Sequence, residues 1–258
     1  MPIESLTLAI DGRLALVSLN RPAARNALSQ ALMRELTRCA RELAERTGVD
    51  VVLLCGSDVC FSAGADLKDA RVWADESLPL VERREIASLG YRLCKAWEEM
   101  PQITIAAIEG YAVGGGLALA LACDWRVAAA DAFVSLPEIS LGIPLTWGTI
   151  ARLTNLLGPA RAKRLTILCE RIAAADALAM GLIDHTAPKG QAVAKAREIA
   201  AQTLAMPAAA VRMSKESVNA IATALNHAGG YMAHDQIALA AASAESRAAR
   251  DAALKTKR

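Results

Sequence analysis

Short apolar runs alternate along the first half of the chain with longer segments in which apolar residues recur every three or four positions. The runs Arg13–Asn20, Val51–Gly56 and Thr104–Gly110 are rich in leucine or β-branched residues and end at Asn or Gly, so each predicts a strand. The run Trp125–Leu136 predicts a further strand. Because strands that alternate with helices need crossover connections, the pattern predicts an α/β fold.

Two helices are predicted between these strands. The first begins after Ser29, a favourable N-cap residue, and can end at Gly48. One of its faces carries regularly spaced apolar side chains: Leu32, Leu36, Cys39 and Leu43. The second helix is predicted over Leu80–Met100, since Pro101 disfavours a helical conformation at the residue before it.

The character of the chain changes after Gly158, where strand signals stop and helical patterns follow one another. The end of the chain, from His227 onward, is rich in alanine. Such a helix buries little area by itself, so we expect it to pack on something large, such as a neighbouring subunit. The pattern therefore predicts a βα core followed by a helical appendage.

Composition narrows the classes of protein that this chain can represent. Its 258 residues are 54% hydrophobic and 22% charged, which is enough for one large domain or a domain with an appendage. The net charge of +2 gives no strong attraction to nucleic acid or membranes. The first residues show no signal-peptide pattern, and the longest uncharged stretch, Tyr111–Cys123, is too short to span a membrane. We therefore expect a cytoplasmic protein with no nucleic-acid or membrane partner.

Cysteine and histidine give no sign of a metal site. The six cysteines are scattered without a C-x-x-C pair, which favours reduced, buried thiols. The three histidines have no cysteine or carboxylate at ligand spacing; they are His185, His227 and His234. We expect no bound metal.

Two loops of small residues follow predicted strands. In the first, Gly64 permits unusual backbone conformations, and Ala63 and Ala65 leave the main chain accessible, although an ordinary tight turn is the favoured interpretation of this loop taken alone. In the second, Gly114–Gly116 precede a helix, whose first N–H groups lack partners and carry the positive end of its dipole. Together the loops could stabilise one developing oxyanion. A dinucleotide site is less well supported, because three consecutive glycines do not make G-x-G-x-x-G.

Four stretches of the sequence resemble the crotonase superfamily, which contains the enoyl-CoA hydratases and isomerases: Leu19–Ser29, Phe61–Leu67, Gly110–Asp124 and Phe133–Pro144. The similarity runs essentially from end to end. It implies a crotonase-like α/β spiral of ββα units over residues 1–200 and a C-terminal helical trimerisation segment over residues 201–258. It also implies an acyl-CoA thioester as ligand, no separate cofactor because coenzyme A is part of the substrate, and a homotrimer or dimer of trimers.

The resemblance assigns catalytic roles to particular positions. The backbone N–H groups of Ala65 and Gly115 would form the oxyanion hole, and Glu138 would be an acid–base residue, although it could also be a surface residue at a strand end. The position of the second glutamate of the family's hydratases is occupied by Ala118. Because one carboxylate suffices to move a proton between two carbons, this pattern favours Δ3,Δ2-enoyl-CoA isomerisation.

The sequence is also consistent with other activities. Hydration is an alternative, and Gly142–Pro144 resembles the hydroxycinnamoyl-CoA hydratase-lyases, which carry a serine where Ala118 stands. A non-catalytic acyl-CoA-binding protein is the alternative of another class. A serine hydrolase is not supported, because the chain has no G-x-S-x-G motif.

The resemblance also suggests residues that contact the acyl-CoA. Arg25 would lie near the nucleotide, although a solvated arginine is equally consistent, and Trp147 would line the acyl pocket or belong to the core. Leu254 and Lys257 would reach the coenzyme A of a neighbouring subunit. The remaining candidate contacts lie in the two small-residue loops: Ala63, Asp66, Leu67 and Gly114. Asp66 could instead be structural, as could Asp124.

One branch of the family binds RNA through a basic helix. Here the arginines of the predicted helix after Ser29 are interleaved with glutamates, which favours a solvated, salt-bridged face; the residues are Arg34, Arg38 and Arg41 with Glu35, Glu42 and Glu45. We therefore expect no RNA partner.

Overall fold

The centre of the molecule is a six-stranded sheet. The computed structural model describes residues 5–69, 77–224, 226, 233 and 235–256. The strand order is β1-β2-β3-β4-β6-β9, in which β1 and β2 are antiparallel and the other neighbours are parallel. These strands are β1 (Leu6–Asp11), β2 (Leu14–Leu19), β3 (Val51–Cys55), β4 (Ile103–Ile108), β6 (Trp125–Ala129) and β9 (His185–Ala187). The predicted α/β class is confirmed.

A second, three-stranded sheet carries the segments close to the candidate chemistry. It consists of β5 (Tyr111–Val113), β7 (Phe133–Ser135) and β8 (Ile172–Ala173). The glycine loop directly follows β5, and the Glu138 segment directly follows β7. Because β5 and β7 pair in parallel, these two segments lie side by side at the carboxyl ends of the strands.

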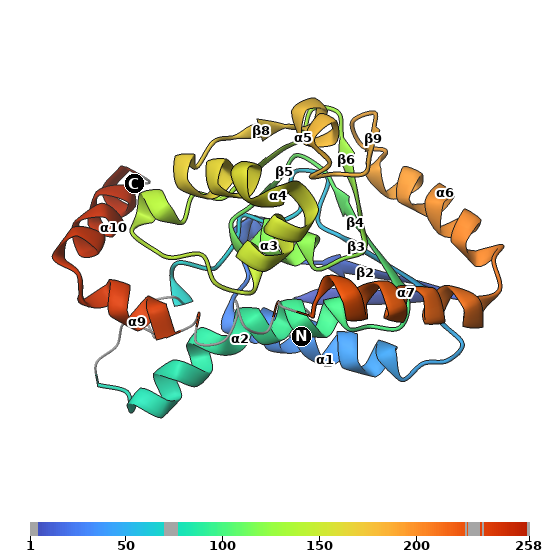
Figure 1. Cartoon of the computed structure of the whole chain (residues 1–258), viewed down its shortest axis with the longest axis horizontal. Coiled ribbons are helices and arrows are strands. Elements are labelled where there is room, and N and C mark those ends of the chain that lie inside the picture. Colours follow the sequence, from blue (N-terminus) through green and yellow to red (C-terminus); the bar gives the residue numbers. More distant parts are fainter. Residues whose placement is uncertain (1–4, 70–76, 225, 227–232, 234, 257–258) are drawn as a thin grey trace.

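Helices surround the large sheet, as Figure 1 shows. They are α1 (Gln30–Ala44), α2 (Leu80–Glu98), α3 (Gly115–Leu121), α4 (Thr149–Leu168), α5 (Ala174–Met180), α6 (Ala192–Leu204), α7 (Ala208–Ala222), α9 (Asp235–Ala242) and α10 (Ala244–Thr256), with short 3-10 turns η1 (Pro22–Ala24) and η3 (Ile139–Leu141). In Figure 1, α9 and α10 lie at the opposite end of the molecule's long axis from α6. None of the helices in the described part of the chain is long and apolar enough to cross a membrane.

Helix α1 begins where the sequence predicts and ends earlier. The Ser29 hydroxyl accepts a hydrogen bond from the Leu32 N–H at 3.2 Å, which confirms the predicted cap. The predicted apolar face is buried. However, the helix ends at Ala44 with Glu45 as its C-terminal cap, so Gly48 does not end it.

Strands β3, β4 and β6 of the large sheet are buried on both faces, which explains why they are almost continuously apolar. In β3, Val52 and Leu54 belong to the core that α1 and α2 cover, whereas Val51 and Leu53 point to the other face. Helix α6 covers that second face with small and aliphatic residues, including Ile199. The site therefore stands on a scaffold packed from both sides.

Two predictions about strands were wrong. Trp125–Leu136 is two strands, because a turn closed by the Ala132 N–H and the Ala129 carbonyl at 2.9 Å sends β6 and β7 into different sheets. Strands also continue after Gly158, as β8 and β9. These strands have only two and three residues, too few for an alternating pattern to be visible.

The C-terminal helices contact the core of the same chain. On α7, the buried Lys215 ammonium donates to the Asp124 carboxylate and to the Gln102 carbonyl, both at 2.7 Å. Asp124 also accepts from the Thr104 N–H and hydroxyl, so its role is structural. Helix α10 packs against η3. Residue 200 lies inside α6, and the division of the chain at that point stays a prediction.

Candidate active site

One cavity, of about 160 Å³, gathers most of the residues that the sequence singled out. Those that line it are Ala63, Ala65, Asp66, Leu67, Gly114, Gly115, Ala118, Glu138 and Trp147. They come from separate segments that the two sheets and α3 bring together. The cavity is therefore the candidate active site.

The first loop leaves one backbone donor free. The Leu28 N–H donates to the Gly64 carbonyl at 2.8 Å, and the Leu28 carbonyl accepts from the Asp66 N–H at 3.1 Å. This parallel bridge uses the groups on either side of Ala65, whose own N–H makes no backbone hydrogen bond among the described residues. Ala65 thus presents a free donor at the cavity.

The second loop leaves another. Gly114 has φ 55° and ψ −124°, a conformation open to glycine, and its N–H donates to the Ser135 carbonyl at 2.8 Å. The chain then enters α3 at Gly115, whose N–H lies in the first turn and has no partner within the helix.

The two loops are in direct contact. A Cβ added to Gly64 would lie 2.7 Å from the Val113 carbonyl oxygen and 3.2 Å from the Gly115 nitrogen. Gly64 also has φ 92°, so glycine is required there for both space and conformation. This close approach allows the N–H groups of Ala65 and Gly115 to serve one ligand atom.

Glu138 lies beside this pair of donors. A Cβ on Gly114 would be 2.8 Å from its Oε1, so the carboxyl group lies directly over the glycine loop. Its Oε2 is buried and has no hydrogen-bond partner among the described residues. Burial raises the pKa of Glu138 to about 7, against a smaller lowering by its own backbone N–H. A carboxyl group in this state can both accept and release a proton near neutral pH.

The other acidic side chains at the cavity already have partners. Asp66 accepts from the Arg21 guanidinium and the Lys68 N–H, both at 3.1 Å, and Asp69 accepts from the Gln30 N–H at 3.0 Å. Ala118 is buried in α3, where its N–H donates to the Gly114 carbonyl at 3.0 Å. Its methyl group makes the cavity wall apolar at the position where a second acid could stand. Among the described residues that line the cavity, Glu138 is therefore the unpaired carboxyl group.

Three of the predicted contacts are not placed in the cavity. Arg25 is exposed and does not line it; its carbonyl instead accepts from the Ala63 N–H at 3.0 Å and supports the first loop. The side chain of Leu254 and the whole of Lys257 lie outside the described residues. The described residues contain no group of three or more His, Cys, Asp or Glu arranged to hold a metal ion.

Sequence reasoning missed several contributors to the site, and Gly90 and Ile237 illustrate why. Gly90, in the middle of α2, lies against the Trp147 indole, and Ile237 of α9 adds to the cavity wall. A glycine inside a helical pattern signals close packing, so Gly90 could have been recognised. Ile237 could not, because nothing in its neighbourhood marks it.

Comparison with known proteins identifies the family. The family model described as enoyl-CoA hydratase/isomerase matches residues 9–252. The chain therefore belongs to the enoyl-CoA hydratase/isomerase family, which is the crotonase superfamily that its motifs resemble.

Individual relatives agree with this assignment. Crotonyl-CoA hydratase of Syntrophomonas wolfei is 34% identical over 220 residues, which cover 85% of this chain and 83% of the relative. The crystal structure of an enoyl-CoA hydratase from Mycobacterium avium subsp. paratuberculosis is similar with a TM-score of 0.87 at 26% identity, over 100% of this chain and 98% of that one. The structure of a Bacillus anthracis enoyl-CoA hydratase is similar with a TM-score of 0.79 at 33% identity, over 99% of this chain and 97% of that one. The crotonase-type fold is thus confirmed.

Proposed function

We propose that this protein isomerises 3-enoyl-CoA thioesters to their conjugated 2-enoyl isomers. The observation that carries the proposal is the buried, unpaired Glu138 carboxyl group beside the free N–H groups of Ala65 and Gly115. The family supplies the class of substrate, an acyl-CoA thioester.

The proposed reaction moves one proton. The thioester oxygen accepts hydrogen bonds from the Ala65 and Gly115 N–H groups, which stabilise the negative charge that develops on it. Glu138 takes a proton from C2, and the electron pair left behind forms a dienolate with the C3–C4 double bond. The same carboxyl group returns the proton to C4, and the double bond ends between C2 and C3.

The surroundings of Glu138 suit this role. A base that must accept a proton and then release it is most effective when its pKa lies near the working pH, and burial raises the pKa of Glu138 to about 7. The apolar wall at Ala118 provides no second group to activate water.

Hydration of 2-enoyl-CoA is the second candidate, because the relatives named above are hydratases. The two reactions can be separated by their products. Isomerisation of a 3-enoyl-CoA creates a conjugated thioester of unchanged mass, which absorbs in the ultraviolet, whereas hydration of crotonyl-CoA adds one water. We expect the wild type to catalyse the first reaction efficiently and the second slowly. Efficient hydration by the wild type would contradict the isomerase proposal.

A pair of variants at position 118 sharpens this test. Ala118→Glu supplies the missing carboxylate, and Ala118→Gln has a side chain of similar size without the acid. We expect hydration to rise in Ala118→Glu and not in Ala118→Gln. Equal rates in the two variants would show that position 118 has no acid–base role. Absence of turnover on every thioester, with binding retained, would favour a non-catalytic acyl-CoA-binding protein.

We also propose that the chain assembles as a homotrimer or dimer of trimers, with Arg25, Leu254 and Lys257 near the nucleotide of coenzyme A. The family resemblance supports both statements, and the alanine-rich C-terminal helices are consistent with a segment that packs on a neighbour. Light scattering after size-exclusion chromatography measures the mass directly. A monomer at micromolar concentration would contradict the assembly.

A further inference from the structure

We propose that Trp147 closes the acyl end of the cavity and restricts the protein to short-chain acyl thioesters. This inference rests on the proposed use of acyl-CoA thioesters. Beyond that proposed function, it assigns Trp147 as the residue that limits the length of the acyl chain.

The indole of Trp147 lies between two helices. A Cβ added to Gly90 of α2 would overlap the Cδ2, Cε2 and Nε1 atoms of the ring, and a Cβ on Gly115 of α3 would overlap Cζ3 and Cη2. The ring therefore rests on the backbone of α2 at one edge and on the oxyanion-hole glycine at the other. An acyl chain bound at Gly115 meets this ring as a wall.

The wall is held in a fixed position. Trp147 has φ 60° and Gly148 has φ 73°, so the chain passes through two consecutive left-handed residues, which is uncommon for a bulky side chain. The Arg152 guanidinium donates to the Trp147 carbonyl at 2.7 Å. Because this hydrogen bond is made to the backbone at the turn itself, it stabilises the conformation that directs the indole into the cavity.

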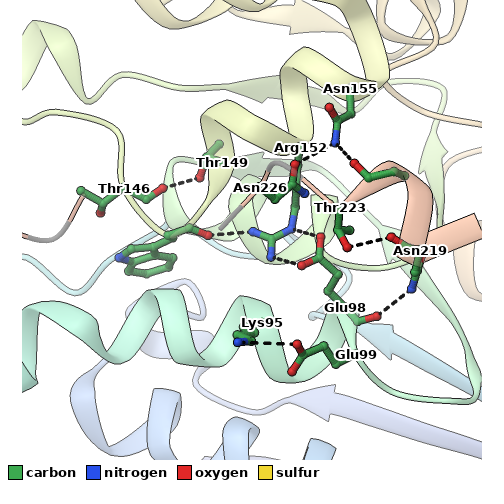
Figure 2. A network of polar contacts seen from close by, with 12 residues as sticks. Lys95, Glu98, Glu99, Thr146, Thr149, Arg152, Asn155, Asn219, Thr223 and Asn226 are labelled. Carbon is green, nitrogen blue, oxygen red and sulfur yellow. Dashed lines mark hydrogen bonds and ion pairs between the residues drawn. The ribbon is translucent and has the colours of Figure 1, made fainter. Parts of the chain in front are cut away.

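Arg152, on α4, is itself anchored to α2. Its guanidinium makes two parallel hydrogen bonds with Glu98 of α2, each of 2.8 Å, and the pair is largely buried. Asn219 of α7 donates to the Glu98 backbone carbonyl at 3.2 Å. Figure 2 shows Arg152 of α4 reaching across to Glu98, with Asn219 on the far side of Glu98. The indole is thus supported by a polar network that connects α2, α4 and α7.

The size of the cavity agrees with a short acyl group. Its volume of about 160 Å³ is below the roughly 300–1,000 Å³ of pockets that enclose drug-sized ligands. Half-exposed residues of the first loop, Ala63 and Ala65–Leu67, form its rim, where the long coenzyme A arm can leave. Trp147, whose ring lies between Gly90 of α2 and Gly115 of α3, bounds the cavity together with aliphatic side chains such as Ile86 and Leu145.

Binding of saturated thioesters tests the inference without requiring turnover. Dissociation constants of butyryl-CoA and octanoyl-CoA can be measured by calorimetry for the wild type and for Trp147→Ala. We expect the wild type to prefer butyryl-CoA, and Trp147→Ala to shift the ratio toward octanoyl-CoA by about 10-fold or more, since methylene groups then enter a new apolar space. An unchanged ratio in folded Trp147→Ala would overturn the inference.

Two further variants make the result specific. Trp147→Leu provides a second truncation with the same expected direction if the alanine variant does not fold. Trp125 of β6 does not line the cavity, so Trp125→Ala should leave the ratio of the two dissociation constants unchanged. Length selectivity without isomerase activity would support Trp147 and contradict the proposed reaction. Binding of neither thioester by the wild type would overturn both.

Discussion

At the scale of single residues, Glu138 is the side chain on which the chemistry depends. No cation among the described residues contributes to its ionisation, which is governed by burial; burial raises the pKa of Glu138 to about 7. If Glu138 is the base, kcat/KM of the wild type should increase with pH and level off above about 7.

Glu138→Gln should lower turnover by about 100-fold or more while CoA-ester binding stays nearly intact. Unchanged turnover on every active substrate would remove Glu138 from the mechanism.

The same burial makes a prediction about stability. In the unfolded chain Glu138 loses its proton near its ordinary pKa of 4.5, whereas in the folded protein it keeps the proton until about pH 7. The folded state therefore becomes less stable, relative to the unfolded state, as pH rises from 4.5 to 7, by about 3 kcal/mol at most. Glu138→Gln removes this penalty and should be more stable than the wild type at pH 8, with a smaller difference at pH 5.

Urea unfolding at the two pH values measures the effect on stability. The control is Glu99→Gln, which changes an exposed carboxylate outside the cavity. A difference between wild type and Glu138→Gln that does not grow with pH would show that the carboxyl group is hydrated and not buried.

At the scale of elements, Glu109 holds the start of α6. Its buried carboxylate accepts hydrogen bonds from the N–H groups of Gly190 at 3.0 Å and Ala192 at 2.8 Å. In Glu109→Gln an amide nitrogen would face one of these donors, so we expect a loss of about 1–2 kcal/mol in the free energy of unfolding. Activity per folded molecule should not change, since Glu109 does not line the cavity.

A control variant on α6 itself separates the effect of the hydrogen bonds at the start of this helix from the effect of losing a charge. Glu198 is exposed and pairs with Lys195 on the surface of α6, so Glu198→Gln should change stability much less. Chemical denaturation of both variants provides the comparison. Equal losses would show that the charge of Glu109, and not its position at the helix start, is what matters.

Elements that bury one regular face were predictable from the sequence, and those defined by tertiary contacts were not. The cap at Ser29 and the buried face of α1 follow from local spacing. The division of Trp125–Leu136 into two strands does not, because both halves are apolar and only their pairing with different sheets separates them. Strands β8 and β9 depend on the neighbouring strands β7 and β6 in the same way.

The candidate site shows the same limit. Small residues in sequence marked Ala65 and Gly115, and motif resemblance marked Glu138; all three line one cavity. The sequence could not show that Oε2 of Glu138 lacks a partner, because that depends on the contacts of several distant segments. Nor could it show the left-handed turn at Trp147, which Arg152 stabilises from the following helix.

At the scale of the whole molecule, the end of the chain connects the site to the proposed assembly. Deleting Ala253–Arg258 removes Lys257, whose charge is expected to attract the phosphates of coenzyme A. We expect a higher KM for CoA thioesters with little change in kcat, and no change for pantetheine thioesters, which lack the nucleotide. The effect on KM should weaken as salt is added.

The comparison of the two ester types decides the interpretation of this deletion. Equal weakening of both would show that the tail acts on folding, on assembly, or on the site through the contact of α10 with η3. In that case Lys257 is not a ligand contact.

The position of α6 has a consequence for chains that end early. The strands of the large sheet up to β6 are complete by residue 129, but the helix that covers their second face begins at Ala192. A chain truncated before Ala192 would therefore lack the helix that covers the face carrying Val51, Leu53 and Ile105. Such exposed apolar surface promotes association between incomplete chains. We expect such a truncated chain to aggregate more readily than the chain that includes α6.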